Sequence, residues 1–139
     1  MMARLALLAA LFLIGCQQSG SLEIQEAWVR PGPPNARMLA AYATLNNGSS
    51  TPVDLVEFSS PSFEVVELHR TQVVDGVSRM RQVRKLQLQP GEEAILEPGG
   101  LHLMLMRPTG PLDKPVTIHI DTASGERYTG LFSVRRADP

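Results

Sequence analysis

The chain has 139 residues and a formal net charge of −1, from 13 basic and 14 acidic side chains. This length fits one ordinary domain, and 43% hydrophobic with 19% charged residues excludes an intrinsically disordered chain. The even charge balance lacks the basic surplus of nucleic-acid-binding domains, so no nucleic-acid partner is expected. The 11 Gly and 11 Pro divide the chain into short segments, which favours an all-β domain over long helices.

An apolar run near the start of the chain is typical of a bacterial secretion signal. It extends from Leu5 to Ile14, follows the basic residue Arg4, and is too short to span a bilayer. The single cysteine, Cys16, comes next after a glycine, and residues 13–16 resemble the lipobox of bacterial lipoproteins. In that motif the cysteine becomes the acylated first residue of the mature protein. The alternative is an ordinary signal peptide in which the cysteine stands by chance.

These features predict a signal peptide over residues 1–15, an acylated cysteine with a polar tether over 16–21, and a folded domain over 22–139. Such a protein lies in the bacterial periplasm and contacts the membrane through its lipid anchor only. Its folded domain contains no thiol. Because an oxidising compartment converts free thiols to disulfides or oxyacids, a soft metal site built there has reason to use methionine thioethers.

The rest of the chain alternates short strand-like segments with turn sequences and shows no helical period. This pattern is typical of a small antiparallel β-sandwich or Greek-key barrel. Turn signals include Asn46-Asn47-Gly48, Asp75-Gly76 and Pro98-Gly99-Gly100. The predicted strands are Leu22–Arg30, Met38–Asn46, Val53–Phe58, Phe63–Val74, Val77–Val83, Glu93–Leu96, Leu101–Met106, Val116–Asp121 and Arg127–Val134.

The strand predicted over residues 101–106 carries metal-binding residue types on one face. Because side chains alternate along a strand, its three leucines face one way and His102, Met104 and Met106 face the other. Methionine is also a normal core residue, and a strand histidine is often simply hydrogen-bonded. This segment alone therefore favours core packing, and Met38 in an earlier strand is assigned to the core or its rim.

A second segment supplies the same two residue types. Asp75-Gly76 is a strong signal for a two-residue hairpin between the strands on either side of it. His69 and Met80 then share a face as diagonal neighbours, about 7–8 Å apart at the backbone. The hairpin and the later strand thus each offer one imidazole and one thioether. The predicted cross-strand pairs are His69 with Gln82, Thr71 with Met80, and Glu67 with Arg84.

Four donors from these two segments make a candidate metal site: His69, Met80, His102 and Met104. The set contains no carboxylate and no thiolate, and hard cations such as calcium and magnesium bind thioethers poorly. The expected ion is Cu(I). Met106 is an accessory donor or a pocket wall, because it lies two residues, about 6.6 Å, further along its strand.

The spacing from His69 to Met104, H-x10-M-x21-H-x-M, resembles the signature of the periplasmic copper chaperones called PCu(A)C. The flanking residues are similar as well, with Val66-Glu67-Leu68 before His69 and Pro98-Gly99-Gly100 shortly before His102. The resemblance covers most of residues 24–134.

The resemblance implies a cupredoxin-like fold and a protein that is not an enzyme but binds one Cu(I) and transfers it to an acceptor. The implied acceptor is a Sco-type thiol protein or the Cu(A) subunit of cytochrome c oxidase. This chain departs from the family in its predicted lipid anchor and in residues 133–139, which lack the His/Met-rich tail of some members. A copper-buffering lipoprotein and a structural lipoprotein without metal stay open. A blue-copper electron carrier is disfavoured, because that centre requires a cysteine ligand.

Overall fold

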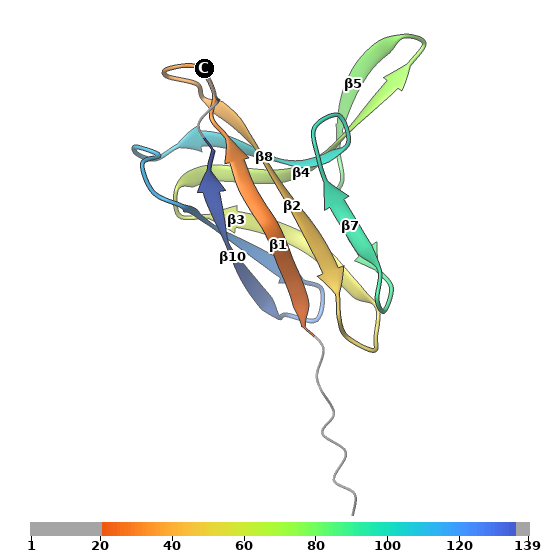
Figure 1. Cartoon of the computed structure of the whole chain (residues 1–139). Helices are drawn as coiled ribbons and strands as arrows, with labels where there is room; N and C mark the ends of the chain where they lie inside the picture. The colour runs from red at the N-terminus through yellow and green to blue at the C-terminus, as the bar shows by residue number, and fades with distance from the viewer. Residues whose placement is uncertain (1–20, 136–139) are drawn as a thin grey trace, which may run out of the picture.

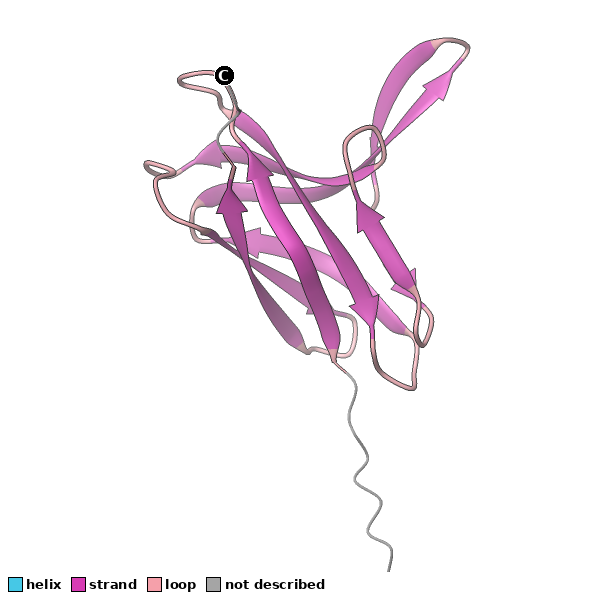
Figure 2. Ribbon diagram, viewed as in Figure 1, coloured by secondary structure: helices cyan, strands magenta, loops and turns pink. Residues whose placement is uncertain are grey.

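The computed structural model describes residues 21–135, and every regular element in that range is a β-strand (Figures 1 and 2). The described residues accordingly include no helix of a length and apolar character that would cross a membrane. The predicted all-β class is confirmed. The strands are β1 (Leu22–Arg30), β2 (Met38–Asn47), β3 (Val53–Ser60), β4 (Phe63–Val74), β5 (Val77–Gln82), β6 (Leu86–Leu88), β7 (Glu93–Leu96), β8 (Leu101–Pro108), β9 (Val116–Thr122) and β10 (Arg127–Val134).

The strands form one sheet that closes on itself. Their order is β5-β4-β8-β7-β2-β1-β10-β9-β3-β6, and a further pairing of β3 with β4 joins the two sides of that series. The strands from β4 round to β3 therefore make a small barrel, with β5 and β6 outside the closed ring. Most pairs are antiparallel, as predicted, but β1 with β10 and β7 with β8 are parallel.

The predicted strand positions differ from the observed ones mainly at strand ends. β2, β3, β8 and β9 each extend slightly beyond the predicted C-terminal residue, and β5 ends at Gln82 instead of Val83. One strand was missed. β6 spans only Leu86–Leu88 and pairs with β3. A segment of that length is too short to show a period in the sequence.

Aliphatic side chains fill the interior of the barrel. In β8 the three leucines, Leu101, Leu103 and Leu105, are buried, and Phe132 of β10 is fully enclosed. The prediction that the leucines of β8 face the core is confirmed. Because side chains alternate between the two faces of a strand, this packing places the histidine and methionines of β8 on its opposite face.

The ends of β4 and β5 project from the barrel as a hairpin arm (Figure 1). Both turn residues have positive φ, 53° at Asp75 and 74° at Gly76, as a two-residue type I′ turn requires. The predicted register is confirmed from Val74 and Val77 to His69 and Gln82. Every residue of β5 is exposed. The start of β1 lies at the opposite end of the barrel from this arm (Figure 1).

The predicted signal peptide, residues 1–15, and the lipidation site Cys16 lie outside the described residues. The same is true of all the predicted tether except Ser21, and of residues 136–139.

Candidate metal site

β4 and β8 bring His69 and His102 directly opposite each other. The two residues are partners in an antiparallel ladder, with ring centroids 6.1 Å apart and ring planes inclined by 54°. Partners in such a ladder point to the same face of the sheet. His102 is buried, and the His69 side chain is 19% exposed. The two imidazoles therefore share one face, at the boundary between protein and solvent.

A backbone carbonyl orients His102. Its Nδ1 lies 3.1 Å from the carbonyl oxygen of Gly100. Because a carbonyl oxygen only accepts, Nδ1 carries the proton and donates it, and the lone pair of the neutral ring falls on Nε2. A metal-binding histidine is commonly held in this way, with one nitrogen donating to a carbonyl and the other left for the ion.

A carboxylate orients His69. Its Nε2 lies 2.9 Å from Oε2 of Glu67, two residues earlier on the same face of β4. The carboxylate oxygen accepts, so Nε2–H donates and the lone pair falls on Nδ1. That Nδ1 is buried without a hydrogen-bond partner, and it is the one such side-chain nitrogen or oxygen within residues 21–135. A buried lone pair without a partner is unfavourable, so this atom suits an electron-pair acceptor.

The contact between Glu67 and His69 corrects the predicted pairing of Glu67 with Arg84. The β4–β5 ladder ends at His69 and Gln82, and β5 does not reach Arg84. At the other edge of β4, Glu67 lies opposite Met104 of β8. Its role beside a candidate ligand was missed, although an acidic residue two positions before a strand histidine shares its face and was a usable signal.

The ladders place the predicted methionines on the same face as the two histidines. Met104 lies two residues along β8 from His102, and it is half-buried. Met80 lies opposite Thr71, which is two residues along β4 from His69 and shares its face. The Met80 side chain is 58% exposed. The four predicted ligands thus share one face across three neighbouring strands, β5, β4 and β8. Their role as ligands stays a prediction.

Two further residues of metal-binding type are Met106, predicted to be an accessory donor or a pocket wall, and His119. Met106 is on the same face as Met104 and lies opposite Val65 of β4, which places it beyond the histidine pair. His119 lies in β9, outside this face, and its Nδ1 is 2.9 Å from Oγ1 of Thr129.

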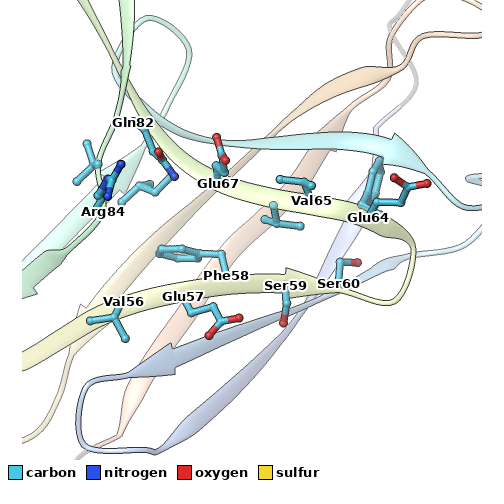
Figure 3. A pocket seen from close by; sticks show the side chains of 14 residues that line it. Val56, Glu57, Phe58, Ser59, Ser60, Glu64, Val65, Glu67, Gln82 and Arg84 are labelled. Carbon is cyan, nitrogen blue, oxygen red and sulfur yellow. The ribbon is translucent and has the colours of Figure 1, made fainter.

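A cleft of about 570 Å³ lies between β3 and β4 (Figure 3). Phe58 and Val65 supply apolar walls, and Glu67 and Arg84 also line it. Neither the two facing histidines nor any methionine lines it. The candidate metal site is therefore distinct from this cleft and is built on the strand face alone.

A family model of LpqE-like lipoproteins matches residues 22–128. A protein of Leifsonia xyli subsp. xyli, named as a lipoprotein, Lxx21020, is 28% identical over 119 residues. That alignment covers 85% of this chain and 70% of the Leifsonia protein.

Solved structures with the same fold include copper proteins. DR1885 from Deinococcus radiodurans, solved with Cu(I), is 30% identical with a TM-score of 0.67, covering 85% of this chain and 80% of DR1885. The copper-bound PCuAC domain from PmoF2 is 18% identical with a TM-score of 0.68, covering 86% of this chain and 96% of that domain. The second likeness shows a shared fold.

Proposed function

Since the chain belongs to the LpqE-like lipoprotein family, we propose that it is an envelope copper chaperone. It binds one Cu(I) through His69, Met80, His102 and Met104 and transfers it to an acceptor protein. The lipid on Cys16 holds it at the membrane, in the periplasm. Copper is its cargo, and the protein catalyses no reaction.

The observation that carries this proposal is the paired orientation of the two imidazoles. Glu67 accepts a hydrogen bond from Nε2–H of His69, and the Gly100 carbonyl accepts one from Nδ1–H of His102. Each ring keeps one nitrogen lone pair, and the lone pair of His69 is buried without a partner. Two neutral nitrogens beside two thioethers form a donor set that suits Cu(I) better than zinc, calcium or magnesium.

The relatives support the choice of metal. DR1885 was solved with Cu(I), and the PCuAC domain of PmoF2 was solved with copper. The first of these is 30% identical to this chain over most of both sequences. Copper is therefore the first metal to test.

Release of the ion follows from the uneven exposure of the donors. His102 is buried, whereas Met80 stands on the exposed hairpin arm. An incoming thiolate approaches from the Met80 side, forms a copper–sulfur bond and displaces the thioether, while the copper stays monovalent. Thiolates are stronger soft donors than thioethers, so transfer to a thiol acceptor is downhill. By family resemblance the acceptor is a Sco-type thiol protein or the Cu(A) subunit of cytochrome c oxidase.

The test is an anaerobic Cu(I) titration of the mature protein against a chromophoric Cu(I) chelator, followed by mixing with a reduced dithiol protein. We expect one tightly bound Cu(I) per chain, lost in full to the dithiol. Retention of copper by this chain would point to buffering instead of delivery. No binding, with no effect of copper on thermal unfolding, would leave a structural lipoprotein.

A further inference from the structure

The methionines of the described chain are gathered on one face of the sheet. Between residues 21 and 135 there are four, and all of them lie on the face that carries His69 and His102. Two of the four belong to the proposed copper site. The other two, Met38 of β2 and Met106 of β8, lie directly opposite each other in the β2–β8 ladder.

Core packing does not account for Met38. Its side chain is 59% exposed, and it is not part of the cluster of buried residues that fills the barrel. The sequence assigned Met38 to the core or its rim, and its exposure excludes the core. The thioether of Met38 is therefore open to solvent, where a soft ion can reach it.

The geometry of the pair suits a shared soft ion. Side chains directly opposite in an antiparallel ladder have Cβ atoms about 4.5–5.5 Å apart. Methionine is unbranched and has three rotatable bonds, so both sulfur atoms can turn toward one ion between them. The one cation of β8, Arg107, is paired with Glu64 of β4.

Met104 connects this pair to the histidines. It lies two residues along β8 from Met106 and two residues from His102, on the same face of the strand. Its partner in β2 is Ala40. The alanine side chain is small, so it leaves room on this face for the longer side chain of Met104. Met38, Met106 and Met104 thus occupy neighbouring ladder positions on one face, in a row that leads to His102 and His69.

We propose that Met38 and Met106 form a second soft-metal site, which takes Cu(I) or Ag(I) through two thioethers and shares Met104 with the histidine site. With thioether donors only, it binds more weakly than the site with two imidazoles and serves as the entry point to it. The ion passes along the row by exchanging one copper–thioether bond for the next, with no change of oxidation state and no proton released. The existence of this second site does not depend on the proposed function, but its role as an entry point does.

Methyl NMR of the mature protein labelled at the methionine methyl groups tests the proposal, with Ag(I) as a redox-stable probe. We expect the first equivalent to shift Met80 and Met104, and the second to shift Met38 and Met106. Met38→Leu and Met106→Leu keep the side-chain volume, so the fold survives. Each should weaken the second binding event by about tenfold or more and leave the affinity for the first within about twofold.

A second titration separates this proposal from the proposed function. In His102→Gln the first binding event is weakened, and Met38 and Met106 should still shift with Ag(I). Absence of any shift at Met38 and Met106 in both proteins would overturn the second site. So would an equal loss of the first event in Met106→Leu, because Met106 would then be a ligand of the histidine site. Failure of the parent to bind a first equivalent would instead overturn the proposed function.

Discussion

His69 and His102 are register partners across β4 and β8, with their ring centroids 6.1 Å apart. If these imidazoles hold Cu(I), replacing either one by Gln removes a nitrogen donor. We expect each variant to lose at least about tenfold in Cu(I) affinity, which corresponds to about 1.4 kcal/mol or more. The measurement is competition with a chromophoric Cu(I) chelator. His119→Gln is the matched control, because His119 already bonds Thr129 away from this face. Equal affinity in all three variants would contradict histidine ligation.

Met80 and Met104 test the thioethers separately from the fold. Replacement of either by Leu conserves volume, so the free energy of unfolding should fall by less than about 1.5 kcal/mol. Cu(I) affinity should fall in both variants, since leucine offers no donor. Urea unfolding and the chelator competition measure the two effects on the same samples. If Met104→Leu binds as tightly as the parent, Met106 becomes the ligand to examine.

Glu67 tests the orientation of His69. Glu67→Gln keeps the shape of the side chain but replaces the carboxylate that accepts the His69 hydrogen bond. We expect Cu(I) affinity to drop by about tenfold to a hundredfold, the range seen when partners of metal-binding histidines are changed. Glu64→Gln is the control, because Glu64 pairs with Arg107 and not with a histidine. Equal losses in the two variants would indicate a general effect of charge.

Leu103 lies on the opposite face of β8 from the candidate ligands and is almost fully buried. Leu103→Ala should lower the free energy of unfolding by about 2–5 kcal/mol, because the removed atoms leave a cavity in the core. The folded fraction should still bind one Cu(I) per chain. Chemical denaturation gives the stability, and the titration at low denaturant gives the stoichiometry. Loss of copper binding in the folded variant would show that the two faces are coupled.

The ion pair between Asp121 and Arg127 predicts a pH dependence of stability. Two hydrogen bonds from the Arg127 guanidinium, of 2.7 and 2.8 Å, hold the pKa of Asp121 below its ordinary value of 3.8. A lowered pKa in the folded state gives stability that is present above pH 3.8 and is lost as the pH falls below it. Asp121→Asn should therefore lower the urea midpoint at pH 7, and this difference should shrink in acid. Asp113→Asn is the control, and a difference that grows in acid would contradict the assignment.

Local signals in the sequence were sufficient for the hairpin and for the faces of β8. Asp75-Gly76 alone determines a register that places His69 and Met80 on one face, and the alternation of leucines assigns His102 and Met104 to the other side of their strand. Both inferences use residues close together in the chain. Strand geometry then leaves little freedom.

Relations between distant strands could not be predicted in the same way. The pairing of β4 with β8, which sets His69 against His102, depends on how the whole sheet closes, and no local pattern encodes it. The parallel contact of β1 with β10 and the pairing of the short β6 with β3 also depend on how the whole sheet closes. Glu67 was assigned to Arg84 because the extent of the hairpin ladder was overestimated.

The described chain begins at the end of the barrel that is farthest from the hairpin arm (Figure 1). Six residues, 16–21, reach at most about 20 Å when fully extended, so an acyl chain on Cys16 would keep the β1 end of the barrel close to the lipid headgroups. Met80 would then face outward into the aqueous space of the envelope. A recipient embedded in the bilayer would need a domain that rises above the membrane surface to collect the ion, whereas a freely diffusing recipient would meet it without obstruction.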